Sequence, residues 1–491
     1  MRATRYILSG LLGLLTLGCT LTLDFDPYRG GSATPDAGVA DSGMGPSSDA
    51  GGGDATVACR PSPEECNELD DDCDGIVDEG GFDPSNCADA CGRGPDGSEP
   101  QVCPERSLCI AGRCGFPPYF MAAGDAHTCA ATNPAGNLFC WGSNSDGQVA
   151  TPGQARVLQP ARVPTPAANV RHIAAGSHHT CAVDYGFGPP YCWGRNNRGQ
   201  LGPVAGSEVE RPLSLPNVED AKSAFAGGDA TCFLRGRSAA QGQLYCGGSN
   251  DDGQFGTGDT SGGNAFPISA GSRIFYRYQV AMGPSHACGL STDDAGAPKI
   301  YCWGNGANGQ LGLPVKVAVR QPRLVLGLTA LAPREWPPLL VTGARHSCAI
   351  DDSVLVCWGS NASGQLGRGS SLAAAGSIDR VMIEGGPVIG PIAAGAAHTC
   401  AATEDTGRLY CWGDNEFGQL GTGLSGDMLV PTEVTIPDND TVTALVAGAR
   451  HTCAATVRGL LYCWGDNAEG QLGLGTRGGI EPIPQRVDGV R

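Results

Sequence analysis

The chain has 491 residues, well above the roughly 250–300 residues at which a single hydrophobic core stops growing, so the length predicts a propeller or more than one domain. Hydrophobic residues make up 41% and aromatic residues 6%, and glycine occupies 76 positions. This composition excludes a wholly disordered chain and favours many short strands joined by turns. The formal net charge is −18, with 50 acidic against 32 basic side chains, so the sequence lacks the basic surface that nucleic-acid binding requires.

Residues 1–18 have the pattern of a signal peptide. Two arginines precede an apolar run from Tyr6 to Leu17, which is too short to span a bilayer comfortably. The string Leu15-Thr16-Leu17-Gly18-Cys19 resembles the lipobox of bacterial lipoproteins, although that family prefers leucine where Thr16 stands. The resemblance implies acylation of Cys19 and lipid anchoring at the outer membrane or cell surface. Plain secretion is the alternative.

The segment after the signal peptide changes composition twice. Residues 19–57 are rich in Gly, Ala, Ser, Asp and Pro, which predicts a disordered acidic tether. Residues 58–115 contain eight of the 23 cysteines and are predicted to form a disulfide-rich module, because so short a segment cannot build a sufficient core. Fourteen more cysteines lie in residues 116–491. Even counts in both segments favour an oxidising compartment, although they do not give the pairing of the first eight.

One loop of the module has carboxylates at the spacing of a calcium site. The expected oxygen ligands come from Asp70, Asp72, Asp74, Ile76 and Asp78. Gly81 stands where an EF-hand has its bidentate glutamate. The loop instead resembles the Cys- and Asp-rich metal-binding repeats of secreted myxobacterial proteins and the calcium loops of thrombospondin-like repeats. It predicts calcium as a cofactor, and an acidic turn held only by disulfides is the alternative.

A unit of roughly fifty residues recurs seven times between residues 116 and 491. Its first signature is Gly-x-x-His-Thr-Cys-Ala, and its second is Tyr-Cys-Trp-Gly-x-Asn-x-x-Gly-Gln-Leu-Gly. Each unit contains a β-hairpin, which cannot bury its faces alone, so the units are predicted to stand radially in a closed ring. We also expect the final run, Pro482–Val487, to join the first strand near Tyr119–Ala122 and lock the ring.

Both signatures resemble the repeats of the regulator of chromosome condensation family, in the cysteine-rich form of exported bacterial proteins. The resemblance implies an all-β fold, with a seven-bladed β-propeller over residues 116–491 that follows the tether and the module. Family members include guanine nucleotide exchange factors and a bacterial β-lactamase inhibitor, and both act by protein contact. Exchange activity is not carried over, because no exchange-specific residues can be matched here.

The two cysteines of each unit lie on facing arms of its hairpin, where Cα atoms come close enough for a disulfide. Buried free thiols are the alternative, and the export signal favours bridges. The seven predicted pairs are Cys129–Cys140, Cys181–Cys192, Cys232–Cys246, Cys288–Cys302, Cys348–Cys357, Cys400–Cys411 and Cys453–Cys463.

Histidine and tryptophan each recur in six of the seven units, and a residue that nearly every blade needs answers an architectural demand. We therefore expect the imidazoles to hydrogen-bond neighbouring backbone and the indoles to pack between blades with their N–H groups bonded. The glutamine amides of the second signature are expected to cap loop backbone. The histidines are His127, His179, His286, His346, His398 and His451.

Binding is expected where the repeats differ. The third unit has Ala230 in place of the histidine and Gly247 in place of the tryptophan. Trp336, which lies outside the repeat signature, stands near Arg334 in a long linker. An exposed tryptophan and arginine are typical binding anchors. Packing of Trp336 beneath its own loop is the alternative.

The sequence contains no nucleophile elbow, Walker loop, dinucleotide fingerprint or HExxH motif, so we do not expect an enzyme. The predicted function is that of an envelope-anchored extracytoplasmic protein. Its propeller would bind an unidentified protein at the cell surface or in the periplasm, with a lipid anchor as its only membrane contact. One alternative is an exported polysaccharide hydrolase or lyase that uses carboxylates on blade loops, such as Asp251, Asp252, Asp293 and Asp294. Another is a structural envelope component.

Overall fold

The computed structural model describes residues 119–490, with gaps, and the backbone of four short strands before them. The gaps are 133–135, 166–169, 185–187, 205, 237–240, 270–274, 294–295, 329–330, 332–338, 373–376 and 405. The chain divides into two compact units, Met1–Ala58 and Cys59–Arg491, and every described residue belongs to the second. The expected signal peptide, tether and calcium loop lie outside the described residues.

The four short strands form two hairpins. β1 (Ala90–Cys91) pairs with β2 (Gln101–Val102), and β3 (Leu108–Ile110) pairs with β4 (Arg113–Gly115). In the second hairpin Cys109 lies directly opposite Cys114. This part of the predicted cysteine-rich module therefore has β structure.

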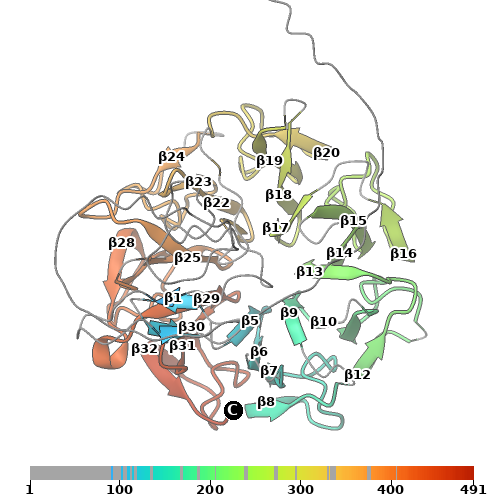
Figure 1. Ribbon diagram of the computed structural model, residues 1–491, viewed down its shortest axis with the longest axis horizontal. Helices are drawn as coiled ribbons and strands as arrows, with labels where there is room; N and C mark the ends of the chain where they lie inside the picture. The colour runs from blue at the N-terminus through green and yellow to red at the C-terminus, as the bar shows by residue number, and fades with distance from the viewer. Residues whose placement is uncertain are drawn as a thin grey trace, which may run out of the picture. The chain divides into compact units, whose positions relative to one another are not determined.

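The rest of the described chain forms seven antiparallel blades of four consecutive strands each, arranged around a ring (Figure 1). Blades one and two are β5 (Tyr119–Ala123), β6 (His127–Thr132), β7 (Leu138–Ser143), β8 (Arg156–Arg162) and β9 (Val170–Ala175), β10 (His179–Asp184), β11 (Tyr191–Arg195), β12 (Glu208–Ser214). Blades three and four are β13 (Ala221–Gly227), β14 (Ala230–Arg235), β15 (Gln241–Gly248), β16 (Gly263–Ser269) and β17 (Phe275–Met282), β18 (His286–Thr292), β19 (Pro298–Gly304), β20 (Val319–Leu324). Blades five and six are β21 (Leu340–Thr342), β22 (His346–Asp351), β23 (Val354–Gly359), β24 (Asp379–Arg380) and β25 (Ile389–Ala394), β26 (His398–Thr403), β27 (Leu409–Gly413), β28 (Met428–Val434). Blade seven is β29 (Val442–Ala447), β30 (His451–Thr456), β31 (Leu461–Asp466) and β32 (Ile480–Val487), and the 3₁₀ turn η1 (Pro437–Asn439) precedes it.

The expected locking of the ring by the last strand is wrong. β32 pairs with β31 of its own blade, with Gln485 opposite Cys463. β5 is the innermost strand of blade one and pairs with β6. Because every blade is built from consecutive strands, the ring closes by side-to-side packing and side-chain hydrogen bonds between blades seven and one.

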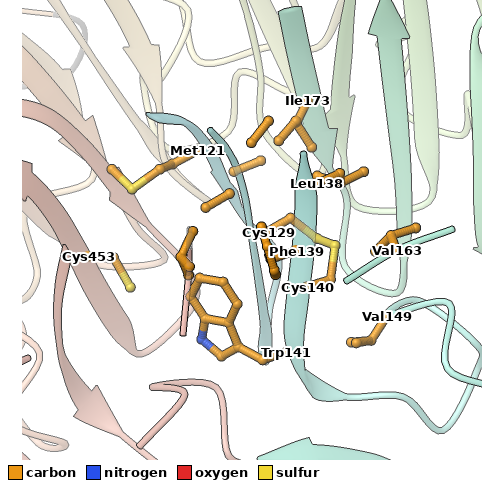
Figure 2. Close-up of a cluster of buried hydrophobic side chains, with 14 of the residues drawn as sticks. Met121, Cys129, Leu138, Phe139, Cys140, Trp141, Val149, Val163, Ile173 and Cys453 are labelled. Atoms are coloured by element: carbon orange, nitrogen blue, oxygen red, sulfur yellow. A yellow bond between two sulfur atoms is a disulfide. The ribbon is translucent and has the colours of Figure 1, made fainter. Parts of the chain in front are cut away.

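The second and third strands of every blade carry a disulfide, and the seven pairs are those expected from the sequence. Each pair lies directly opposite in the ladder, as Cys129 and Cys140 do, and in this pair the Cα atoms are 4.1 Å apart. Figure 2 shows this bridge beside the buried indole of Trp141. Each bridge closes a short loop, which limits its entropic contribution to about 3 kcal/mol or less.

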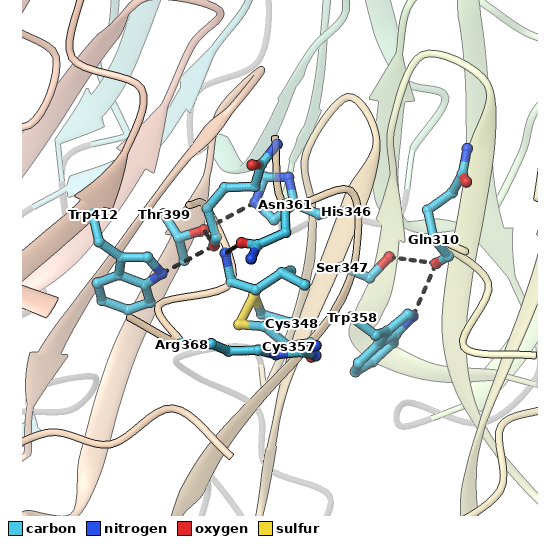
Figure 3. Close-up of a disulfide and its surroundings, with 12 residues drawn as sticks. Gln310, His346, Ser347, Cys348, Cys357, Trp358, Asn361, Arg368, Thr399 and Trp412 are labelled. Carbon is cyan, nitrogen blue, oxygen red and sulfur yellow. Dashed lines mark hydrogen bonds between the residues drawn. A yellow bond between two sulfur atoms is a disulfide. The ribbon is translucent and has the colours of Figure 1, made fainter. Parts of the chain in front are cut away.

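Blade five differs from the others at its outer edge. Its fourth strand, β24, has only two residues, and Asp379 is the residue opposite Cys357. The guanidinium of Arg368 lies next to this short strand, beneath the disulfide in Figure 3. It donates hydrogen bonds to the carbonyl of Cys357 at 2.8 Å and to the carbonyl of Ser377 at 3.0 Å. Arg368 also forms an ion pair of 2.8 Å with Asp379. Its side chain therefore stabilises the outer strand of this blade, which has few backbone hydrogen bonds of its own.

Candidate binding surfaces

The recurring histidines link neighbouring blades. Each imidazole Nε2 lies 2.7–3.0 Å from a threonine or serine hydroxyl on the second strand of the next blade, and the last bond joins His451 to Thr128 across the closing seam. The sequence correctly indicated an architectural role. The expected backbone partner is wrong, because the partner is a side chain of the next blade, 52–61 residues later in five cases and 323 residues earlier for His451.

The hydroxyl partners fix the tautomer of five of these histidines. In Figure 3, Ser347 donates its single hydroxyl hydrogen to the carbonyl of Gln310 at 3.0 Å. It must therefore accept a hydrogen bond from Nε2 of His286, which then carries the proton. Burial lowers the pKa of these imidazoles from 6.5 to about 3 in four cases and to about 4 in His346 and His451. Neutral, buried imidazoles of this kind stabilise the ring and are unsuited to proton transfer near neutral pH.

The tryptophans and glutamines of the second signature serve the same seams. Trp358 donates its indole N–H to the carbonyl of Gln310 at 2.9 Å, so this one carbonyl accepts two hydrogen bonds from the next blade (Figure 3). All six signature tryptophans make the equivalent bond. Each glutamine side chain caps a backbone amide two residues before it, as Gln310 does for Asn308 at 2.8 Å. The repeated polar residues are therefore used inside the fold.

The network is interrupted at blade three. Ala230 lacks an imidazole, and the corresponding position in blade four is Ala287 rather than a threonine, so the seam between these blades has neither partner. Gly247 likewise removes the indole bond between blades two and three. Phe233 lies two positions along the same face of the sheet from Thr231, the residue opposite Gly247. Phe233 is fully buried in the cluster between these blades and supplies aromatic volume that the glycine lacks.

The central channel is lined by the first strand of every blade. A cavity of about 120 Å³ at one mouth and one of about 220 Å³ further in share one small or apolar residue from each blade. The shared residues are Ala123, Ala175, Ala226, Met282, Thr342, Ala394 and Ala447. Asp125 and His172 are the titratable residues among those that line the two cavities. This lining offers no cluster of acid and base groups.

Strand connectivity gives the propeller two different faces. The first face carries the turns between strands one and two and between strands three and four of each blade. The second face carries the hairpins between strands two and three and the connections between blades. Asp251 and Asp252 follow β15 and lie on the first face, whereas Asp293 follows β18 and lies on the second. Asp294 lies outside the described residues.

These carboxylates already have partners of their own. Asp251 pairs with Arg198 of blade two, and Asp252 accepts a hydrogen bond of 2.8 Å from the amide of Asn305. Asp293 caps its own hairpin through the backbone N–H of Ala297 at 2.8 Å. Each of the three described acids is therefore engaged in an ion pair or hydrogen bond, and Asp293 lies on the opposite face from the other two.

Charged side chains gather near the channel mouth on the first face. Arg195 forms two hydrogen bonds with Asp146, of 2.8 and 2.9 Å, and His178 stands 3.5 Å from the same carboxylate. Burial acts to raise the pKa of Asp146, but the hydrogen bond and charge of Arg195 outweigh it and lower that pKa. On blade seven the exposed guanidinium of Arg450 stacks 4.3 Å over the ring of Phe417. These charged side chains lie on the first face outside the channel, whose own lining is small or apolar.

Several residues that the sequence singled out lie outside the described residues. They are Cys19, the calcium positions Asp70, Asp72, Asp74, Ile76 and Asp78, and the linker residues Arg334 and Trp336. Among the described residues no group of three or more His, Cys, Asp or Glu side chains could hold a metal ion. The same residues contain no helix of sufficient length and apolarity to cross a membrane.

The fold and its repeated hydrogen-bond network define a seven-bladed repeat propeller. Sequence models of the regulator of chromosome condensation (RCC1) repeat match residues 135–183, 190–234, 299–350, 406–455 and 458–491. A second model of this repeat matches residues 120–148, 278–310, 392–419 and 442–471. The chain belongs to the regulator of chromosome condensation repeat family.

Known proteins agree with this assignment. The chain is 30% identical over 369 residues to the ultraviolet-B receptor UVR8 of Arabidopsis thaliana, covering 72% of this chain and 78% of the receptor. It is 30% identical over 312 residues to the E3 ubiquitin-protein ligase HERC2 of Homo sapiens, and there it spans only 6% of the relative. Among solved structures, Prp20p from Saccharomyces cerevisiae superposes with a TM-score of 0.60 at 24% identity, covering 72% of this chain and 86% of that one. Human WBSCR16 also superposes with a TM-score of 0.60, at 22% identity.

Proposed function

We propose that this protein is an extracytoplasmic binding protein that presents a rigid propeller to another protein and performs no catalysis. The observation that carries the proposal is the use of the repeated polar residues. Histidines, hydroxyls, indoles and glutamines are bonded between or within blades, and the channel has no acid–base cluster. What remains for function is the surface, where the blades differ from one another.

A protein partner agrees with what is known of related propellers. Prp20p is described with its binding properties to Gsp1p and histones. That likeness, at 24% identity, does not identify a partner for this chain. The seven disulfides suit an oxidising compartment, which supports a partner at the cell surface or in the periplasm.

The N-terminal segment completes the proposal. Acylation of Cys19 would anchor the protein at the outer membrane or cell surface, and residues 19–57 would hold the folded parts away from the lipid. Calcium bound by the carboxylates of Asp70, Asp72, Asp74 and Asp78 would stabilise the module. The lipid is tested by labelling cells with an alkynyl fatty acid, and Cys19→Ala should abolish the label. Retained label in that variant would contradict acylation at this position.

The partner is tested by capture after reversible crosslinking in intact cells. The bait is the full chain with a C-terminal affinity tag, and an unrelated tagged lipoprotein serves as the control. A protein enriched on the bait alone, with and without a calcium chelator, is then purified and mixed with the purified bait. Direct complex formation supports the proposal. No enrichment, or turnover of an added glycan by the purified chain, contradicts it.

A further inference from the structure

The outer strands of the propeller share a proline, and blade five lacks it. The fourth strand of each blade has one residue directly opposite the second cysteine of the disulfide, and in six blades the residue just before it is proline. These prolines are Pro160, Pro212, Pro267, Pro322, Pro431 and Pro484. In blade five this position is Ile378, because Asp379 is the residue opposite Cys357.

The proline position faces outward from the sheet. In blade one Val163 donates its N–H inward to the carbonyl of Leu138 at 2.8 Å, and in blade five Val381 donates to Leu355 at 2.8 Å. Backbone groups alternate in direction along a strand, so residues 379 and 381 bond inward. Residues 378, 380 and 382 therefore turn their N–H and C=O groups away from β23.

A proline at this position has no N–H to offer a foreign strand, and edge prolines of this kind block strand addition. Six blades thus have a blocked edge. Ile378 keeps its N–H, and among the residues that the structure describes it makes no backbone hydrogen bond. Its side chain packs against the buried cluster of blade five, which holds this edge against the blade.

One exposed apolar side chain belongs to this edge and another to the loop that precedes it. Leu372 is 82% exposed and Met382 is 77% exposed, the two highest values among the exposed large hydrophobic side chains of the described residues. Met382 belongs to the outward-facing series, and Leu372 lies in the loop that leads to β24, where its carbonyl accepts a hydrogen bond from Asn361 at 3.2 Å. Open backbone groups beside exposed apolar side chains are the features that strand addition uses.

The charges on this edge argue against a second copy of this chain as the occupant. Two antiparallel copies of the edge could pair around Asp379, around Arg380 or around Val381. The first two registers place carboxylates or guanidiniums opposite each other, which is destabilising, and the third leaves each Arg380 opposite Met382 with no acidic partner. A strand from another protein, apolar and with an acidic residue opposite Arg380, avoids the like-charge conflicts and pairs this guanidinium.

We propose that the outer edge of blade five, residues 378, 380 and 382, is a docking site for an extended apolar segment of a partner protein that adds a fifth strand to the blade. The assignment rests on the proposed binding function and specifies where binding occurs. The added segment would form its ladder bonds with the outward-facing backbone groups of these three residues, beside the short strand β24.

The probe is a phage-displayed library of random ten-residue peptides selected against the full chain. Selected peptides should be apolar with one acidic residue and should protect the amides of Ile378, Arg380 and Met382 from hydrogen exchange. Ile378→Pro introduces the residue found in the other six blades. It should weaken peptide binding roughly tenfold or more, because it removes one or two ladder hydrogen bonds and prevents the peptide from packing closely against the edge. Ile378→Val keeps the N–H and should bind as the parent chain does.

Two further variants keep the test decisive if Ile378→Pro folds poorly. Arg380→Asp should weaken binding of the selected acidic peptides and favour peptides with a basic residue instead. Pro431→Ile, in blade six, should leave the affinity of the selected peptides for blade five unchanged. The proposal is overturned if Ile378→Pro binds the peptides equally well, if protection falls elsewhere, or if the parent chain self-associates through this edge. If Ile378→Pro captured the cellular partner as well as the parent chain does, the assignment of binding to this edge would be overturned, whereas the proposed binding function would still be supported.

Discussion

Acidification should destabilise this propeller strongly, because six buried imidazoles must stay neutral in the folded chain. Their ordinary pKa of 6.5 falls to about 3 in four of them and to about 4 in the other two, with burial as the largest cause. Between pH 6.5 and about 4 the unfolded chain binds protons that the folded chain refuses. The free energy of unfolding therefore rises with pH in this window, and stability is lost as the pH falls through it.

The size of the effect follows from the number of histidines. Each fully protonated histidine of the unfolded chain contributes about 1.4 kcal/mol per pH unit, so six of them set an upper slope of about 8 kcal/mol per pH unit. The assay is urea unfolding with the disulfides intact, measured from pH 7.5 to pH 4.5. The slope of unfolding free energy against pH gives the protons taken up.

Substitution distinguishes these histidines from the carboxylates that also titrate. His398→Gln should reduce the proton uptake on unfolding by about one. Thr452→Val removes the hydroxyl that His398 contacts at 2.9 Å; it should lower stability and leave the proton count unchanged. An unaltered slope in His398→Gln, or stability that increases on acidification, would show that the buried neutral histidines do not control the pH dependence of stability.

Three other predictions concern the seams and bridges. Ala230→His combined with Ala287→Thr should restore the missing link between blades three and four, and a double-mutant cycle of unfolding free energies should give a favourable coupling of about 1 kcal/mol; a coupling of zero would mean that the two side chains do not meet. Trp464→Phe keeps one aromatic ring but loses the five-membered ring and its N–H hydrogen bond of 3.0 Å, so it should cost at least about 1–2 kcal/mol in urea unfolding, and a loss below about 0.3 kcal/mol would argue against a role for the N–H. Replacing Cys400 and Cys411 together by alanine should lower stability by about 3 kcal/mol or less, and mass spectrometry of the parent chain should find no free thiol at either position.

The fold could be predicted from the sequence because the signals that define it are local and repeated. The cysteines of each unit fall on the two arms of one hairpin, as in Cys129 and Cys140, so their pairing follows from hairpin geometry. Glutamines such as Gln310 cap amides two residues away, which is also a local interaction. Seven copies of one unit left few alternatives to a propeller.

The interactions between blades could not be read in the same way. His127 bonds the hydroxyl of Thr180, 53 residues later, and nothing in the local pattern distinguishes that hydroxyl from nearby backbone. The closing seam was mispredicted because a short extended run near the C-terminus, Pro482–Val487, fits either an exchanged strand or a simple outer strand. Ile378 was missed although the signal was present in the sequence. The signal becomes visible only when the fourth strands are aligned by the residue opposite the second cysteine of each disulfide, because the residue just before it is then proline in six blades.

We propose that this propeller works by contact with another protein. The most direct test of this proposal is a calorimetric titration of the purified full chain with the protein recovered by crosslinking in cells. A binding function should give saturable binding with a fixed stoichiometry and no chemical change in either protein. The absence of saturable binding, or covalent alteration of the added protein during the titration, would contradict it.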